Sequence, residues 1–307
     1  TDMKNTVNRI RKLPLIPAAL FCCFMWGSAP PFIKWGYEAL NIADTGSILL
    51  FAGIRFFLAG IMVLIYAALS KKQDVLFPYK YFMPIACLAL FQTAGQYFFY
   101  YMGLAHASSV MGAILSSVSG FFALILSAWV FRLEKMTFYK MIGMLLGLGG
   151  VVILNLKGLK FSFSMAGEGM LLLSQVSSAM SAVLIQIFSK KNDPVALSGW
   201  QFALGGAVLI LSGCIMGGHI AWNAKGMGIL CWLAFVSAAA YTLWGILLKE
   251  YPVSSVGVFS ASIPLFGIVF SVLLLHETSA LTINAFIALV LIAAGVLAMN
   301  CKESKKI

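Results

Sequence analysis

Long uninterrupted apolar runs restrict what this chain can fold into more than any other feature of its sequence. A helix needs about 20 apolar residues to cross the hydrocarbon core of a bilayer. Such runs can be marked at residues 15–35, 46–69, 81–103, 107–131, 138–155, 168–188, 195–217, 227–248, 255–275 and 282–300. They are continuous and lack the alternation, over roughly ten residues, of a transmembrane β-barrel strand. The sequence therefore predicts an all-α integral membrane protein with ten transmembrane helices.

The composition supports a membrane location. Only 10% of the residues are charged and 61% are hydrophobic, whereas about 25% of the residues of a soluble domain are charged. Lipid is therefore the expected surrounding for most of the chain. The net charge of +11 could suggest a nucleic-acid partner. The basic residues, however, lie in short clusters between apolar runs and form no continuous basic face, so we expect no such partner.

The distribution of basic residues predicts the orientation. Cytoplasmic loops carry an excess of Lys and Arg. If both termini are cytoplasmic, the ten runs place Arg55 within a span and only Lys34, Lys157, Lys160 and Lys225 outside. Every other Lys and Arg of the 21 then lies inside. We expect a multi-pass plasma-membrane protein with both termini cytoplasmic, and the short loops fit a bacterial inner membrane.

The sequence also contains an internal repeat. Residues 52–60 read AGIRFFLAG and residues 198–206 read SGWQFALGG, so Gly53 and Gly60 align with Gly199 and Gly206. At the same offset, Ser108-Ser109-Val110 aligns with Ser254-Ser255-Val256. Ordered matches at a near-constant offset indicate duplication. We predict a cytoplasmic segment at 1–14, a five-helix repeat at 15–156, a second one at 157–300 and a cytoplasmic tail at 301–307.

An odd number of spans in each half has a consequence for topology. The second half must enter the membrane in the opposite sense to the first, which makes the two halves inverted repeats. Two equivalent halves can exchange conformations and so open a site at the membrane midplane first to one side and then to the other. The repeat therefore predicts a secondary transporter that works by alternating access.

Several short motifs carry a resemblance to a known family. They are Trp26-Gly27-Ser28, Arg55-Phe56, the carboxylates Glu134 and Glu277 at the ends of the fourth and ninth runs, and the pairs Gly150-Val151 and Gly295-Val296. At these residues the chain resembles the ten-helix EamA-type carriers of the drug/metabolite transporter superfamily. The resemblance implies that spans 1, 3, 4, 6, 8 and 9 line a central cavity, while spans 2 and 7 brace it and spans 5 and 10 lie at the periphery. Substrates across the family are too diverse to identify one.

The third run supplies the clearest candidate binding face. Gln92, Gln96 and Tyr100 recur at i, i+4 and i+8 and so share one side of a helix, with Tyr97 beside them. Amides can bind an amine or a carboxylate, and phenols give an aromatic wall with a polar tip. The alternative is hydrogen bonding between packed helices, at about 0.6 kcal/mol per contact. The family layout favours the cavity.

Other runs add polar and aromatic candidates. Gln175 and Ser178 of the sixth run either face the cavity or pack against a neighbouring helix. Aromatic candidates are Trp26 of the first run and Tyr241 and Trp244 of the eighth. These rings either stack on an organic ligand or lie in the core or against lipid. The predicted substrate-binding residues are Trp26, Gln92, Gln96, Tyr97, Tyr100, Gln175, Ser178, Tyr241 and Trp244.

Arg55 is the only basic residue well inside a run. An arginine at a helix centre costs roughly 2.5–3.5 kcal/mol on insertion scales, so it must face protein or water. It could clamp a substrate carboxylate or bond structurally to neighbouring carbonyls. We favour the structural role, because its partner in the repeat is Gln201 and the family places span two outside the cavity. For the small residues of the fourth run, among them Ser116, Ser119 and Gly120, we favour helix packing.

An uncharged cavity rich in amides and aromatic rings favours an amino acid or a similar small zwitterion as the substrate. The alternative is a choline-like organic amine held in an aromatic cage of Trp26, Tyr97, Tyr241 and Trp244. No catalytic or metal-binding motif and no channel filter occurs at membrane depth, so we expect neither an enzyme nor a channel, and no cofactor or metal. Proton or ion coupling and the oligomeric state stay open. For Pro30-Pro31 and Pro264, we favour a kink over a break in the helix.

Overall fold

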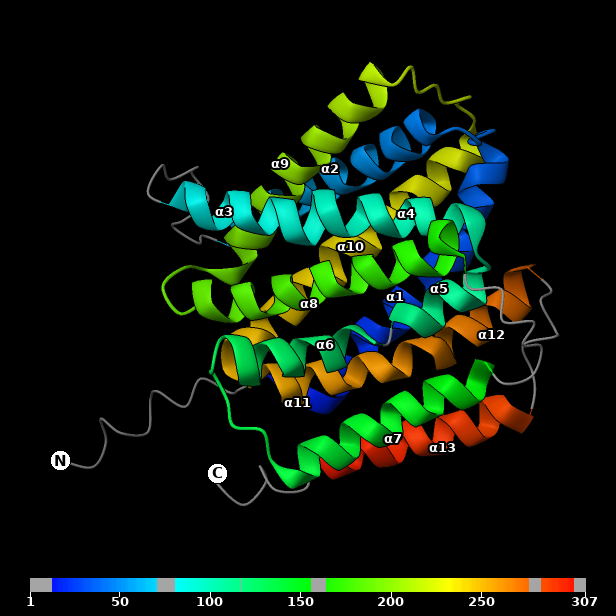
Figure 1. Cartoon of the computed structure of the whole chain (residues 1–307). Helices are drawn as coiled ribbons and strands as arrows, with labels where there is room; N and C mark the ends of the chain where they lie inside the picture. Colours follow the sequence, from blue (N-terminus) through cyan, green and yellow to red (C-terminus); the bar gives the residue numbers. More distant parts are fainter. Residues whose placement is uncertain (1–12, 71–80, 117, 156–163, 276–282, 301–307) are drawn as a thin grey trace.

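The computed structural model describes residues 13–70, 81–116, 118–155, 164–275 and 283–300, and these residues contain helices and no strands (Figure 1). The helices are α1 (Leu15–Ala39), α2 (Thr45–Leu69), α3 (Phe82–Leu88), η3 (Ala89–Gly95), α4 (Gln96–His106), α5 (Ser109–Ser116), α6 (Ser119–Ile125), η4 (Leu126–Val130), α7 (Phe138–Asn155), η5 (Met165–Gly169), α8 (Met170–Phe188), α9 (Pro194–Ile215), α10 (Ala224–Glu250), α11 (Val253–Gly257), η6 (Val258–Ser262), α12 (Ile263–Leu275) and α13 (Ile283–Asn300).

Seven helical segments within the described part of the chain are long and apolar enough to cross a membrane. They are Leu15–Ala39, Thr45–Leu69, Phe82–His106, Met165–Phe188, Pro194–Ile215, Ala224–Glu250 and Val253–Leu274. Two shorter apolar helices cover Ser119–Val130 and Phe138–Gly150. The all-helical membrane architecture is thus observed, while the count of ten spans and the inversion of the two halves stay predictions.

The sequence predicted one continuous helix over the fourth apolar run, but the structure shows an interrupted one. It divides into α5 and α6, and the Val118 amide donates to the Leu115 carbonyl in a turn between them. Serine hydroxyls near the division bond to the backbone: Ser116 Oγ donates to Gly112 O at 2.6 Å and Ser119 Oγ donates to Ser116 O at 3.0 Å. Such side-chain bonds compete with the helical hydrogen-bond ladder and favour an interruption.

The prolines behave differently in the first and ninth runs. Helix α1 continues through Pro30 and Pro31 without a break. In the ninth run, the 3₁₀ segment η6 separates α11 from α12, and Pro264 is the second residue of α12. A proline in the first turn of a helix lacks only an amide that would have no partner within that helix. Pro264 therefore accompanies a change of helix type.

Helices α2 and α9 cross at unusually close range because glycines face each other. A Cβ added to Gly53 would lie 2.9 Å from the carbonyl oxygen of Gly206, and one added to Gly60 would lie 2.9 Å from that of Gly199. Small residues allow two helix backbones to approach within a membrane, where packing provides much of the association energy. The glycines matched in the repeat thus form the α2–α9 contact.

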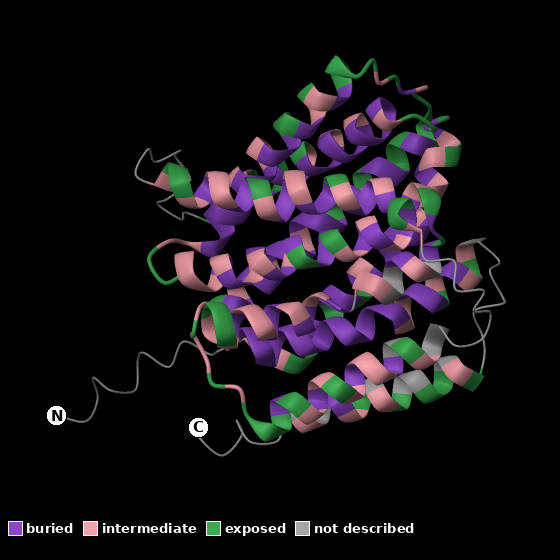
Figure 2. Cartoon of the chain, viewed as in Figure 1, coloured by how far each residue is buried: buried purple, intermediate pink, exposed green. Residues whose placement is uncertain are grey.

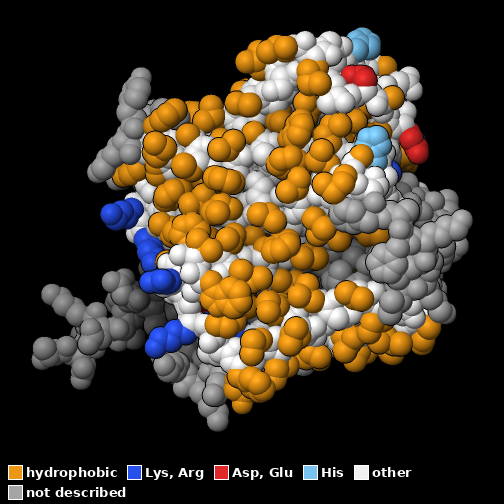
Figure 3. All heavy atoms as spheres, viewed as in Figure 1, with side chains coloured by type: hydrophobic (Ala, Val, Ile, Leu, Met, Phe, Trp, Pro, Cys, Tyr) orange, Lys and Arg blue, Asp and Glu red, His pale blue; other side chains and the backbone are white. Residues whose placement is uncertain are grey.

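The outer surface is apolar between two polar ends. Buried residues concentrate where the helices meet, and much of the exposed surface carries large hydrophobic side chains, such as Leu69 and Ile215, which are 78% and 77% exposed (Figures 2 and 3). Most Lys and Arg side chains visible in Figure 3 lie at the left edge, the end at which α8 ends and α7 begins in Figure 1. This distribution suits a protein surrounded by lipid.

Candidate functional site

A cavity lies between the central helices, with an empty volume of about 840 Å³ that includes space open to solvent. Its lining comes from α1, η3, α4, α5, α6, α8, α10, α11, η6 and α12, and Arg55 is the one lining residue on α2. None of the described residues of α7, α9 and α13 lines the cavity. This arrangement agrees with the layout implied by the family resemblance, except at Arg55.

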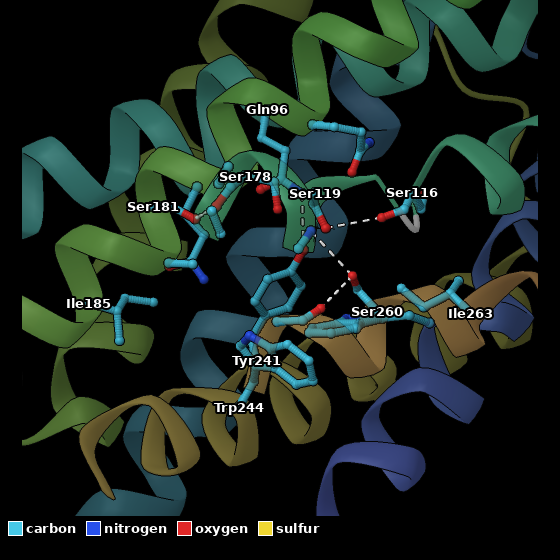
Figure 4. Close-up of a pocket in the computed structure, with 18 of the residues that line it drawn as sticks. Gln96, Ser116, Ser119, Ser178, Ser181, Ile185, Tyr241, Trp244, Ser260 and Ile263 are labelled. Carbon is cyan, nitrogen blue, oxygen red and sulfur yellow. Dashed lines mark hydrogen bonds between the residues drawn. The ribbon is translucent and has the colours of Figure 1, made fainter. Parts of the chain in front are cut away.

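All nine residues predicted to bind substrate line this cavity: Trp26, Gln92, Gln96, Tyr97, Tyr100, Gln175, Ser178, Tyr241 and Trp244. Figure 4 shows Gln96, Tyr241 and Trp244 approaching the same space from α4 and α10, with Ser178 and Ser181 of α8 beside it. These nine residues come from five separate segments: α1, η3, α4, α8 and α10. Contact with a substrate stays a prediction for each residue.

Aromatic rings form one wall. The ring of Trp26 on α1 lies 4.9 Å from that of Tyr241 and 4.9 Å from that of Trp244, measured between centroids. Residues 241 and 244 lie at i and i+3 on α10, so both rings leave the same side of that helix. Because α1 packs directly against α10, these three rings both join the helices and face the cavity.

A polar network connects α4 to α10 across the cavity. Gln96 Nε2 donates to Tyr241 OH at 3.1 Å, and the hydroxyls of Tyr97 and Tyr241 are hydrogen-bonded to each other. Three buried atoms of lining residues have no hydrogen-bond partner in the described part of the protein: Gln92 Oε1, Gln96 Oε1 and Trp26 Nε1. An unpaired buried polar atom costs about 1–3 kcal/mol. These two acceptors and one donor are therefore available to a ligand.

A group of serines lies beside the interruptions in the fourth and ninth runs. Ser116, Ser119 and Gly120 line the cavity, although the sequence favoured helix packing for them. Ser260 on η6 also lines the cavity and was not predicted from the sequence. Ser260 Oγ donates to Gly257 O at 2.7 Å and accepts from Gly120 N–H at 3.2 Å (Figure 4). Gly120 both packs closely and faces the cavity. Serines just before Pro264 were the sequence signal that could have indicated Ser260.

The cavity extends along two helix faces and becomes apolar at one end. Its lining on α8 runs from Gln175 to Ile185, about 15 Å at 1.5 Å per residue, and on α10 from Tyr241 to Leu248. Ile185, Leu248 and Val253 form the apolar part near the end of α8 and the start of α11. Polar lining residues precede this apolar part along the same helices, Gln175 and Ser178 on α8 and Tyr241 on α10, so the cavity suits a ligand with a polar head and an apolar remainder.

Arg55 is buried, with 1% of its surface exposed. Its Nε donates to Leu233 O and to Ser237 Oγ, both at 3.1 Å, and its Nη1 donates to Tyr101 OH at 2.7 Å. The bond to the Leu233 carbonyl agrees with the structural role favoured from the sequence. The position of Arg55 in the lining, however, does not fit the expectation that span two lies outside the cavity. Among the described residues, the lining contains no Asp or Glu, and Arg55 is its one charged side chain.

Glu134 forms a separate polar cluster outside this lining. Its carboxylate accepts hydrogen bonds from Ser127 Oγ at 2.8 Å and from Ser254 N–H at 3.1 Å, and also from the Ser254 hydroxyl. It is also paired with Lys140. Glu134 thus joins η4, α7 and α11 at the end of the bundle. Glu277, its counterpart in the repeat, lies outside the described residues.

The chain was compared with known protein families and proteins. The model of the EamA-like transporter family matches residues 13–156 and, a second time, residues 165–301. An uncharacterized transporter of Bacillus subtilis, YvbV, is 28% identical over 96% of this chain and 95% of its own length. A probable amino-acid metabolite efflux pump of Salmonella typhimurium is 26% identical over 90% of this chain and 91% of its own.

A crystal structure of another protein shares the fold. It covers 95% of this chain and 99% of its own, with a TM-score of 0.75 at 18% sequence identity. At that identity, the likeness establishes the arrangement of the helices and nothing about the ligand.

Proposed function

Because the chain belongs to the EamA-like transporter family and is therefore a multi-pass membrane transporter, we propose that it moves an amino acid or a similar small zwitterion through the cavity. The observation that carries this proposal is the polar lining. Within the described part of the chain, it contains one buried cation, no carboxylate, and the unpaired acceptor atoms Gln92 Oε1 and Gln96 Oε1. An ammonium group can donate to these oxygens. The description of the Salmonella relative as an amino-acid metabolite efflux pump supports the same class.

Alternating access between two inverted repeats, at 15–156 and 157–300, is the proposed mechanism. In the repeat, Gly53 corresponds to Gly199 and Gly60 to Gly206. A two-fold axis between the halves requires that a contact of Gly53 with Gly206 be copied as one of Gly199 with Gly60, and both close approaches occur. Likewise, α1 packs on α10 and α12, while α8 packs on α4 and α6. These matched pairs support the inverted arrangement.

Interruptions occur at matching places in both proposed repeats. The α5–α6 division lies in the fourth run and the η6 segment in the ninth, and both supply serines to the cavity. In transporters built from inverted repeats, paired interruptions of this kind mark the binding site, because freed backbone groups can bind ligands there. Their position therefore supports a substrate site at the junction of the two repeats.

The proposed topology has ten spans and cytoplasmic termini, in a bacterial inner membrane. Arg132, Lys135, Lys190 and Lys191 lie between helices at one end of the bundle. Asp44, Glu168 and His219 lie near helix ends at the opposite side. An excess of basic residues marks the cytoplasmic side, which supports this orientation.

An organic amine is the second candidate, because Trp26, Tyr241 and Trp244 do gather in the lining. The fourth member of the predicted cage, Tyr97, already has a cation near its ring: the Arg55 guanidinium carbon lies 5.7 Å from the ring centroid. A second cation placed there would be repelled by Arg55. The geometry therefore favours the zwitterion.

Counterflow in proteoliposomes tests the proposal. Vesicles are loaded with a mixture of amino acids or of amines, and entry of a labelled member of each class is followed. The proposed function requires saturable exchange with the amino acids. Exchange confined to amines would establish the second candidate, and verified folded protein without amino-acid exchange would refute the first.

Two variants sharpen the choice. Gln96→Ala should slow amino-acid exchange at least tenfold, because it removes an acceptor and the bond to Tyr241. Trp244→Ala should have the larger effect on an amine carrier. Gln186→Ala and Trp222→Ala are the matched controls, since neither residue lines the cavity. Unchanged exchange in both Gln96→Ala and Trp244→Ala would contradict the assignment of the site.

A further inference from the structure

We propose that Arg55 is the carboxylate-binding group of the cavity, so that the carried compound must bear a carboxylate. The inference rests on the proposed function and adds the part of the substrate that this residue recognises. The sequence favoured a purely structural arginine, and the burial, charge and free donors of Arg55 argue for the additional role.

Arg55 is a buried cation without an anion. The carboxylates of the described residues lie outside the cavity lining, and the ion pair observed among these residues joins Glu134 to Lys140 instead. A buried charge is strongly unfavourable unless it is compensated, and within a membrane span such a charge is typical of a substrate pathway. A substrate carboxylate would supply the missing negative charge.

The guanidinium group is fixed and still has free donors. Nε and Nη1 bond to Leu233 O, Ser237 Oγ and Tyr101 OH. The guanidinium carbon also lies 4.9 Å from the ring centroid of Phe56. The bonds observed for Arg55 involve only Nε and Nη1, whereas a guanidinium carries five N–H donors in a rigid fork. Since Arg55 lines the cavity, its remaining donors are available to a ligand there.

The rest of the lining complements a zwitterion bound in this way. Gln92 Oε1 and Gln96 Oε1 are acceptors and suit the ammonium group, whereas Trp26 Nε1 is a second donor for an anion. Charge-assisted bonds to a planar carboxylate are stronger than neutral ones, and arginine can form two in parallel. Recognition of the carboxylate at Arg55 therefore gives the substrate a defined orientation.

The test uses four probes of one carbon skeleton: leucine, leucinamide, 3-methylbutylamine and 4-methylpentanoate. Binding is measured on the purified full chain as ligand-induced thermal stabilisation, which follows affinity. Wild-type protein should be stabilised more strongly by leucine and 4-methylpentanoate than by the amide or the amine. Equal stabilisation by leucine and leucinamide would overturn the inference without any mutant.

Variants then locate the effect. Arg55→Gln should weaken leucine binding about tenfold to a hundredfold and leave leucinamide unchanged, as expected for loss of a charged hydrogen bond. Arg55→Lys should retain the preference for carboxylates at reduced affinity, because it keeps the charge and loses the fork. If Arg55→Gln does not fold, Arg55→Lys alone tests whether this residue binds the carboxylate. A purely structural arginine would instead change the binding of all probes by the same factor.

Lys140→Gln is the matched control. Lys140 is also a buried cation, but it is paired with Glu134 and does not line the cavity. It should lower the unfolding temperature without changing probe selectivity. Carboxylate binding through Arg55 without amino-acid exchange would refute the proposed function alone. Amino-acid exchange with unchanged selectivity in Arg55→Gln would refute the inference alone.

Discussion

At the scale of single residues, Glu134 provides a strong test of stability. Its side chain and that of Lys140 are 9% and 8% exposed, and the same carboxylate accepts bonds from Ser127 and Ser254. Removing one partner of a buried ion pair costs about 3–5 kcal/mol. Glu134→Gln should therefore lower the unfolding temperature markedly in detergent. Lys190→Gln, at an exposed position, serves as the control, and equal unfolding temperatures would contradict the role of the pair.

Asp44 predicts a pH dependence outside the spans. Hydrogen bonds from the Ser47 hydroxyl and amide lower the pKa of Asp44 below its usual value of 3.8. A lowered pKa in the folded state contributes stability above the unfolded-state value, and this is lost as the pH falls through the folded-state value. Between pH 5 and pH 3, roughly spanning the usual value, Asp44→Asn should therefore lose less thermal stability than wild type. Parallel melting curves for the two proteins would refute this.

Residue patterns identified nine of the residues that line the cavity. Helical spacing placed Gln92, Gln96 and Tyr100 on one face, and the structure gives that face to the cavity. Ser260 was missed because the nearby serines of the ninth run, Ser260 and Ser262, do not recur at the helical spacing seen in the third run. Arg55 was judged mainly structural because its partner in the repeat is Gln201 and the family layout places span two outside the cavity. Its position in the lining depends instead on how α2 packs on α4 and α10.

At the scale of helices, the contact of α6 with α11 depends on Gly120. A Cβ on this residue would lie 2.0 Å from the carbonyl oxygen of Gly257, so the two backbones would have to separate. Gly120→Ala should reduce transport at least tenfold and lower the unfolding temperature, because the cavity wall would shift. Gly149→Ala is the control, since no heavy atom lies within 4 Å of its added Cβ. Wild-type transport in Gly120→Ala would show that this wall tolerates movement.

Hydropathy predicted where helices occur better than where they are interrupted. An apolar run indicates that a segment lies in lipid, and the fourth and ninth runs are apolar along their whole length. The division between α5 and α6 depends instead on local bonds of Ser116 and Ser119 to the backbone, and that of the ninth run accompanies Pro264. The interruptions thus accompany local features, side-chain hydrogen bonds in one run and a proline in the other, which average hydropathy does not report.

At the scale of the whole molecule, the proposed orientation can be mapped with single cysteines. In a chain with its six cysteines replaced, His219→Cys and Lys190→Cys introduce thiols at exposed positions on opposite ends of the bundle. A membrane-impermeant maleimide should label position 219 in intact cells and position 190 only after permeabilisation. The reverse labelling would invert the topology, and labelling of both in intact cells would exclude ten spans.

The cavity also has a consequence for how such a chain can be divided. Gln92, Gln96 and Arg55 belong to the first match to the family model, whereas Gln175, Tyr241 and Trp244 belong to the second. Neither segment alone carries all the residues that line the cavity, yet each contains its own apolar helices. Two polypeptides cut between the matches should be inactive when produced singly and should restore transport when produced together. Such complementation would show that the two halves can assemble as separate subunits.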